Sequence, residues 1–236
     1  MMRGILVLFF LLSCWLSMAQ SLQNDSSFVS EAKKNSVKLY SKVTGPQSHI
    51  YNGHAYIEYR QQEEEHPYFI DEWLDGTVVY EDELYENIPL LYDISNDEII
   101  TDHRYNVNKI QLIGSKVKSF TLQKHRFVNL NEENIPAGFY EILYDGQTKV
   151  YAQWRKVLQE TITAQTIERR FDDKTLYFIR KDGKMISVKS KKSVLDVFAD
   201  KKSELRKFLH ANPTPFKADR AKNISQMAQH YDQLHP

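Results

Sequence analysis

Short apolar or aromatic runs recur about every ten residues between residues 50 and 190, and turn-forming residues separate them. The run IPLLYDI shows a period of two, with one apolar side formed by Ile88, Leu90, Tyr92 and Ile94. This period is typical of a strand with one buried face. The spacing leaves no room for crossover helices, so the pattern predicts an antiparallel sheet.

Turn residues punctuate these runs. Asp145-Gly146 and Asp182-Gly183 each separate two strand-like runs, which predicts two-residue hairpins at both places. Asn52-Gly53 is another turn pair. The segment from Arg155 to Phe171 is ambiguous, because its pattern suits an extended strand plus loop or a short helix.

Both ends of the chain carry a helical period. Residues 28–43 have apolar positions near helical spacing after Ser26 and Ser27, which can cap a short helix. Near the C-terminus, Ser193-x-x-Asp196 resembles a capping box. Two apolar stripes follow, interrupted by NPTP: Val194, Leu195, Phe198, Leu205, Phe208 and Leu209, then Ala221, Ile224, Met227, Ala228, Tyr231 and Leu234.

These periods together predict a mainly β fold. We expect an antiparallel meander, forming an open barrel or a sandwich, with a short N-terminal helix. Two amphipathic helices between about residues 191 and 235 would pack on the sheet or over a barrel mouth.

The first twenty residues, MMRGILVLFFLLSCWLSMAQ, have the layout of a secretory signal peptide. Arg3 precedes an apolar run, and small residues stand at the −3 and −1 positions of a site after Ala19. We therefore expect a signal peptide at 1–19, a polar linker at 20–27 and one β-rich domain at 28–236. The alternative is a lipoprotein anchored through Cys14, because LLSC resembles a lipobox. Neither reading leaves a transmembrane span in the mature chain, and both place it in the periplasm or outside the cell.

Composition narrows the chemistry. Cys14 is the only cysteine of the 236 residues, so a mature chain would have neither a disulfide nor a thiolate site. Lys and Arg balance Asp and Glu, which disfavours nucleic acid as a partner. The charges are nevertheless segregated: residues 71–103 hold eleven acids and no Lys or Arg, and residues 104–236 have an excess of eleven bases. The folded chain either keeps two charged faces or interleaves them.

Metal sites are weakly supported. His49 and His54 lie five residues apart, too far on a strand to share one zinc ion, unless the turn at Asn52-Gly53 brings them together with His66. The run DISNDE offers calcium ligands at Asp93, Asn96, Asp97 and Glu98 but fails the EF-hand pattern. The favoured interpretation is a polar turn from Ser95 to Asp97 between two strands.

Enzyme motifs are missing from the sequence. There is no G-x-S-x-G, P-loop or G-x-G-x-x-G, and SKKS at residues 190–193 suits a helix start. Carboxylates are so numerous that a facing pair for glycoside hydrolysis has no diagnostic weight. The sequence therefore predicts no catalytic, cofactor-binding or metal-binding residue, and favours a protein that is not an enzyme.

Several phrases carry a family resemblance: LYSKVTGPQSHIYNGHAYIEY, GTVVYEDELYENIPLLYDISNDEII, GFYEILYDGQTKVYAQ and SKKSVLDVFADKKSELRKFL. The chain resembles a family of uncharacterised exported β-rich proteins of Gram-negative bacterial envelopes. The resemblance covers most of the mature chain and implies a cell-envelope location. It supplies no catalytic residue.

The sequence thus predicts an exported, non-catalytic cell-envelope protein with a binding or accessory role. Its partner would be another envelope protein or an apolar ligand. One alternative is a carrier that holds a lipid on the concave face of a half-barrel. The other is an envelope glycan hydrolase with paired carboxylates.

Overall fold

The computed structural model describes residues 49–59, 66–102, 109–162 and 167–234, together with Val29, Glu31, Ala32, Asn35 and Ser36. The chain divides into two compact units, residues 1–48 and 49–236. In the first unit the predicted signal peptide and linker lie outside the described residues. The described positions of the expected helix at 28–43 are helical.

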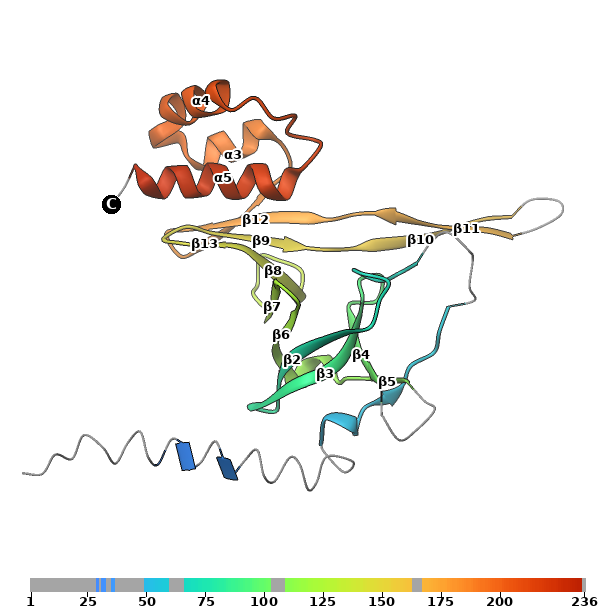
Figure 1. Ribbon diagram of the computed structural model, residues 1–236. Coiled ribbons are helices and arrows are strands. Elements are labelled where there is room, and N and C mark those ends of the chain that lie inside the picture. The colour runs from blue at the N-terminus through green and yellow to red at the C-terminus, as the bar shows by residue number, and fades with distance from the viewer. Residues whose placement is uncertain are drawn as a thin grey trace, which may run out of the picture. The chain divides into compact units, whose positions relative to one another are not determined.

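The second unit is built on an open, entirely antiparallel sheet of eleven strands in the order β1-β5-β4-β3-β2-β6-β7-β8-β9-β12-β13 (Figure 1). This confirms the predicted mainly antiparallel fold. The strands are β1 (His54–Ala55), β2 (Leu74–Tyr80), β3 (Glu83–Asp93), β4 (Glu98–Asp102), β5 (Lys109–Gln111), β6 (Val117–Leu122), β7 (His125–Leu130), β8 (Gly138–Asp145), β9 (Lys149–Gln153), β12 (Leu176–Lys181) and β13 (Lys184–Val188). Short 3-10 turns, η2 (His49–Tyr51) and η3 (Gly114–Lys116), precede β1 and β6.

The first core lies on the face of the sheet that the period of two predicts. Leu90, Tyr92 and Ile94 of the IPLLYDI run are buried there, as expected. The prediction of a single buried face is wrong for the end of this strand, because Leu91 and Asp93 on the opposite face are buried as well. Aromatic rings fill this core: those of Phe120 and Phe127 stack with centroids 4.5 Å apart, and Tyr92 packs edge-on against both. Burying such rings is the main stabilising contribution of this half of the sheet.

The second core lies between β9, β12, β13 and three helices. The helices are α3 (Lys191–Val197), α4 (Lys202–Ala211) and α5 (Arg220–Gln233), and a 3-10 turn, η4 (Ala199–Lys201), separates α3 from α4. Val150, Ile179, Leu205 and Met227 are fully buried between them. The amphipathic C-terminal stripes therefore pack on the sheet, as predicted.

The first C-terminal stripe forms two helices instead of one. The break falls at Phe198, whose buried ring stacks on Tyr231 of α5 at 4.3 Å. The predicted capping box at Ser193 and Asp196 was one turn too late. Ser190 is the N-cap of α3, and its hydroxyl accepts the Ser193 amide while Ser193 bonds back to the Ser190 amide.

The two predicted two-residue hairpins behave differently. At Asp182-Gly183 the prediction is confirmed, because Lys181 pairs with Lys184 and both turn residues have positive φ. At Asp145-Gly146 it is wrong: Asp145 pairs with Lys149, which leaves residues 146–148 as the loop. A residue of α5 holds that loop open.

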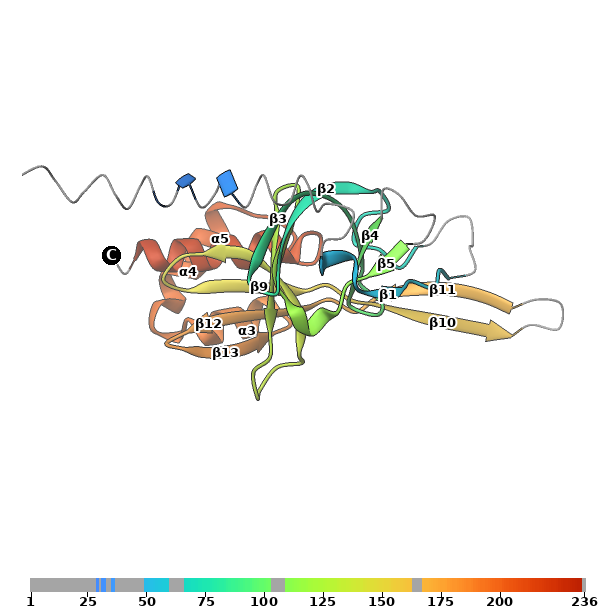
Figure 2. The ribbon, with the colours of Figure 1, turned by 90° about the horizontal axis from the view of Figure 1, so that it is seen from below.

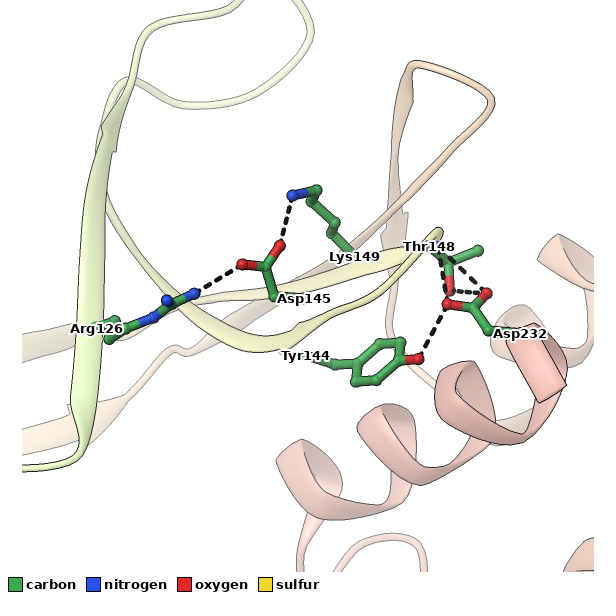
Figure 3. Close-up of polar contacts among 6 residues, drawn as sticks. All are labelled: Arg126, Tyr144, Asp145, Thr148, Lys149 and Asp232. Atoms are coloured by element: carbon green, nitrogen blue, oxygen red, sulfur yellow. Dashed lines mark hydrogen bonds and ion pairs between the residues drawn. The ribbon is translucent and has the colours of Figure 1, made fainter. Parts of the chain in front are cut away.

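That residue is Asp232, which clamps α5 to the β8–β9 loop (Figure 3). Its carboxylate accepts the Thr148 amide at 3.0 Å, the Thr148 hydroxyl at 2.8 Å and the Tyr144 hydroxyl at 3.0 Å. A side chain at Gly146 would meet the Tyr144 hydroxyl and the Asp232 carboxylate, so a larger residue there would displace the clamp. The clamp therefore fixes the last turns of α5 to the sheet.

Candidate functional site: the β10–β11 arm

One pair of strands leaves the sheet. β10 (Lys156–Ile162) and β11 (Ile167–Asp173) continue β9 and β12 and form a two-stranded ribbon, here called the arm. Figures 1 and 2 show the arm extending away from the rest of the sheet. The described residues of the ambiguous segment from Arg155 to Phe171 are therefore extended and not helical. A ribbon of only two strands is marginally stable by itself, so the arm depends on its root.

The root of the arm is fastened to the body by main-chain bonds. The Lys156 amide donates to the Ile94 carbonyl at 3.1 Å, and the Lys174 amide donates to the Arg155 carbonyl at 2.8 Å. The Lys156 ammonium also donates to the His66 carbonyl at 2.7 Å. The first residues of β10 are therefore held by the turn after β3.

These bonds determine which edge of β10 is open. Because the Lys156 amide points to Ile94, it points away from β11, and backbone groups alternate sides along a strand. The amides and carbonyls of Leu158, Glu160 and Ile162 consequently point away from β11 as well. In the described part of the chain, β11 is the only strand that pairs with β10. These six backbone groups form an open pairing edge.

The arm also exposes apolar side chains. Ile162 is 81% exposed and Val157 is 41% exposed, whereas Val150 and Ile179 in the inner half of the same hairpin are fully buried. Nearer the root, Leu158 pairs across the ribbon with Phe171, whose ring meets Tyr59 edge-on at 5.5 Å. An ion pair between Arg169 and Glu160, at 2.6 Å, joins the two strands farther out. The outer arm thus presents apolar surface beside an open edge.

Asp93, at the start of the run DISNDE, has a structural role. Asp93 is fully buried, and one carboxylate oxygen accepts the amides of Ser95 and Asn96 at 2.8 and 3.1 Å. The other oxygen accepts the Tyr56 hydroxyl at 3.0 Å. Burial raises the pKa of Asp93. The carboxylate therefore holds the predicted polar turn, whose neighbour Ile94 anchors the arm.

Asp97 has a second structural role. It has a positive φ of 62°, and its carboxylate accepts the Tyr92 hydroxyl at 2.5 Å and the Phe139 amide at 3.1 Å. Burial raises the pKa of Asp97 too. The carboxylate oxygens of Asp93 and Asp97 all accept hydrogen bonds from protein donors, while Asn96 is exposed on the turn. This arrangement does not support a calcium site.

The histidines do not converge. His49 lies 3.5 Å from the Glu81 carboxylate, His54 begins β1 opposite Gln111, and His66 stacks on Tyr68. The described residues contain no group of three or more His, Cys, Asp or Glu side chains that could hold a metal ion.

A buried polar cluster around Glu141 was not predicted from the sequence. Glu141 of β8 is 6% exposed; one carboxylate oxygen lies 2.5 Å from His125 Nδ1, and the other accepts the Trp154 indole N–H at 2.6 Å. An acid that orients a histidine is half of a catalytic triad. No hydroxyl or thiol of the described residues is hydrogen-bonded to His125, so the cluster lacks a nucleophile. A His and a Glu sixteen residues apart on adjacent strands give no local sequence signal.

The alternatives for an apolar ligand and for a glycan find little geometric support. A lipid on the concave face would compete with the packed rings of Phe69, Tyr92, Phe120, Phe127 and Phe139. The buried acids Asp93 and Glu141 and the half-buried Asp97 accept hydrogen bonds from protein donors. β1 and β13 at the ends of the sheet also have open edges, but the arm combines an open edge with the strongly exposed side chain of Ile162.

None of the described helices has the length and apolar character needed to cross a membrane. No protein-family model, curated protein or solved structure matches the chain, so comparison with known proteins suggests no role for the arm.

Proposed function

We propose that the protein is an exported, non-catalytic binding protein of the cell envelope, and that the arm is its binding element. The single observation that carries this proposal is the open edge of β10, with unpaired backbone groups at Leu158, Glu160 and Ile162 among the described residues. Such an edge binds an extended segment of a partner protein by adding a strand. The main-chain bonds supply affinity, and neighbouring side chains supply specificity.

The proposed partner is an extended segment of another envelope protein. Ile162 and Val157 lie on opposite faces of the ribbon, so an added strand would cover apolar surface on both faces. The Glu160 carboxylate, paired with Arg169, leaves little net charge along the edge. We therefore expect a segment with alternating apolar and polar residues and few acids.

Export is the part of the proposal that rests on the first nineteen residues alone. Arg3, the apolar run after it and the small residues before Gln20 support cleavage after Ala19. Sequencing the mature N-terminus tests this directly. A chain beginning at Gln20 is the expected result, a lipid-modified Cys14 would make the protein a lipoprotein, and an intact Met1 in the cytoplasm would contradict export.

Site-specific photocrosslinking in the cells that make the protein tests the arm. A photoreactive residue at Ile162 should give an adduct of discrete mass. The same residue at Ile186, an apolar position of β13 that is 36% exposed, serves as the matched control. A synthetic peptide copying the crosslinked segment should then slow amide exchange at Leu158, Glu160 and Ile162. The proposal fails if both positions give the same adducts, or if the peptide leaves these amides unchanged.

A further inference from the structure

The helical layer, residues 189–234, carries a net positive charge. It contains ten Lys and Arg against five Asp and Glu. Eight of the ten bases are exposed: Lys189, Lys191, Lys192, Arg206, Lys207, Lys217, Arg220 and Lys222. The layer therefore keeps a positive surface, although the whole chain has no formal net charge.

Most acids of the layer already form an ion pair or a hydrogen bond with another residue of the protein. Asp196 pairs with Lys202 at 2.6 Å, and Asp200 pairs with Lys181 at 2.9 Å and accepts the Tyr231 hydroxyl. Asp219 caps α5 through the Lys222 amide, and Asp232 forms the clamp to Thr148. Among the described residues, only Lys202 of the ten bases forms an ion pair. The exposed bases of the layer are therefore available to a partner.

Two of these exposed bases, Arg206 and Lys207, belong to α4, the outermost helix of the layer. α5 packs on β8 and β9 and α3 packs on β13, while α4 packs on the other two helices. Figure 1 accordingly shows α4 as the helix farthest from the sheet. Its buried side carries Leu205, and its outer side forms a shallow depression lined by bases such as Arg206 and Lys207 and also by the acids Asp200 and Glu204.

The opposite charge lies on the other side of the molecule. The strands of the acidic run, β2 to β4, and the helices flank the β9–β12 hairpin from opposite sides (Figure 1). Exposed acids there include Asp71, Glu72, Asp75, Glu83, Glu86 and Asp102. Glu81 and Asp82 pair with Lys116 and Lys118, so part of the acidic charge is neutralised locally. The fold thus keeps a basic and an acidic side.

We propose that the outer face of the helical layer, centred on α4, docks on the surface of an anionic lipid bilayer. Phosphate-bearing headgroups match a broad field of exposed cations better than a single phosphate does, because the shallow depression has no enclosed polar pocket. Each Lys or Arg that reaches such a surface contributes a small, additive attraction. The acidic side would be repelled, which gives the docked protein a defined orientation. This surface is separate from the arm.

Vesicle co-sedimentation tests the proposal. The chain beginning at Gln20 contains the entire second unit and lacks the apolar run. It should bind vesicles of equal parts phosphatidylcholine and phosphatidylglycerol, and should not bind pure phosphatidylcholine. Binding should weaken steeply as salt shortens the screening length from about 30 Å at 0.01 M to about 8 Å at 0.15 M. Equal binding to both vesicles would overturn the proposal, as would no binding to either.

Two variants of equal charge locate the surface. Lys191→Gln, Lys192→Gln, Arg206→Gln and Lys207→Gln together remove four exposed cations of the layer. We expect them to weaken vesicle binding by about a hundredfold. The control carries Lys116→Gln, Lys118→Gln, Lys124→Gln and Lys149→Gln, all outside the layer and the arm, and should bind within about threefold of the parent. Equal losses in both variants would contradict the assignment.

Competition separates the bilayer from other sources of phosphate. Inorganic phosphate at the same ionic strength as chloride should release no more protein than chloride does. Stronger release would indicate a phosphate pocket and overturn the surface proposal. Tighter binding to duplex DNA than to the anionic vesicles would overturn it as well. Because the arm is unchanged in both variants, its photocrosslinks remain a separate readout.

Discussion

The two halves of one long hairpin have opposite environments. The inner half, β9 with β12, lies between two further strands and beneath three helices, and Val150, Ala152 and Ile179 are fully buried there. The outer half, β10 with β11, continues the same two strands, yet Ile162 is 81% exposed. Backbone pairing continues through both halves, so pairing alone does not explain why the inner half is stable. Burial accounts for the inner half, and the outer half remains open for binding.

The largest expected difference between the halves is in core substitutions. Ile179→Ala removes a fully buried side chain from the second core and should lower the free energy of unfolding by about 2–5 kcal/mol. Ile162→Ala removes the same atoms from an exposed site and should change it by less than about 0.5 kcal/mol. Chemical denaturation of both variants measures the contrast, and equal losses would show that the outer arm is packed against something.

The next effect concerns the clamp at the far end of the inner half. Asp232→Ala leaves the Tyr144 and Thr148 donors without their acceptor and should cost about 2–3 kcal/mol. Asp145→Ala is the matched control on the same hairpin, because its partners Arg126 and Lys149 form exposed ion pairs (Figure 3). It should cost about 0–1 kcal/mol. A larger loss at Asp145 than at Asp232 would refute the clamp.

A smaller, pH-dependent effect lies at the junction of the two halves. Burial raises the pKa of Asp93 above its usual 3.8, so the folded protein binds this proton more tightly than the unfolded chain does. The stability from this group is fully present below pH 3.8 and is lost as the pH rises through the raised pKa. In Asp93→Asn an amide oxygen can still accept the Ser95 and Asn96 amides. The variant has no carboxyl group at this site, so it does not lose stability through ionisation of residue 93 as the pH rises.

Denaturation measured across that pH window should therefore show Asp93→Asn gaining stability relative to the parent as the pH rises. Asp145→Asn should behave in the opposite sense. Lys149 and Arg126 hold the pKa of Asp145 below its usual 3.8, so its contribution is present above that value and is lost on acidification. Parallel pH profiles for the parent and the Asp93→Asn variant would contradict the account of Asp93.

Local sequence signals predicted the strands and several turns. The alternation of Ile88 to Ile94 identified a strand and one of its two buried sides, and Asp182-Gly183 specified its hairpin, because both signals are complete within a few residues. The turn from Ser95 to Asp97 was also predicted, while the structural role of the Asp93 carboxylate required the contact from Tyr56, thirty-seven residues away.

Long-range contacts account for what the sequence did not predict. The β8–β9 loop has three residues because Thr148 bonds to Asp232, eighty-four residues later. The helix break at Phe198 depends on a ring in α5. The secondary structure of the arm was ambiguous for a related reason. Its apolar residues do not line one buried face, because Val157 and Ile162 are exposed on opposite faces of the ribbon.

Amide hydrogen exchange along the long hairpin tests the central claim most directly. In the isolated protein, the Leu158, Glu160 and Ile162 amides should exchange quickly, while the Val150, Ile179 and Ala152 amides should be strongly protected. Adding the partner segment identified by crosslinking should slow the three arm amides and leave the inner ones unchanged. Strong protection of Leu158, Glu160 and Ile162 in the isolated protein would show that the edge is already paired and would contradict the account.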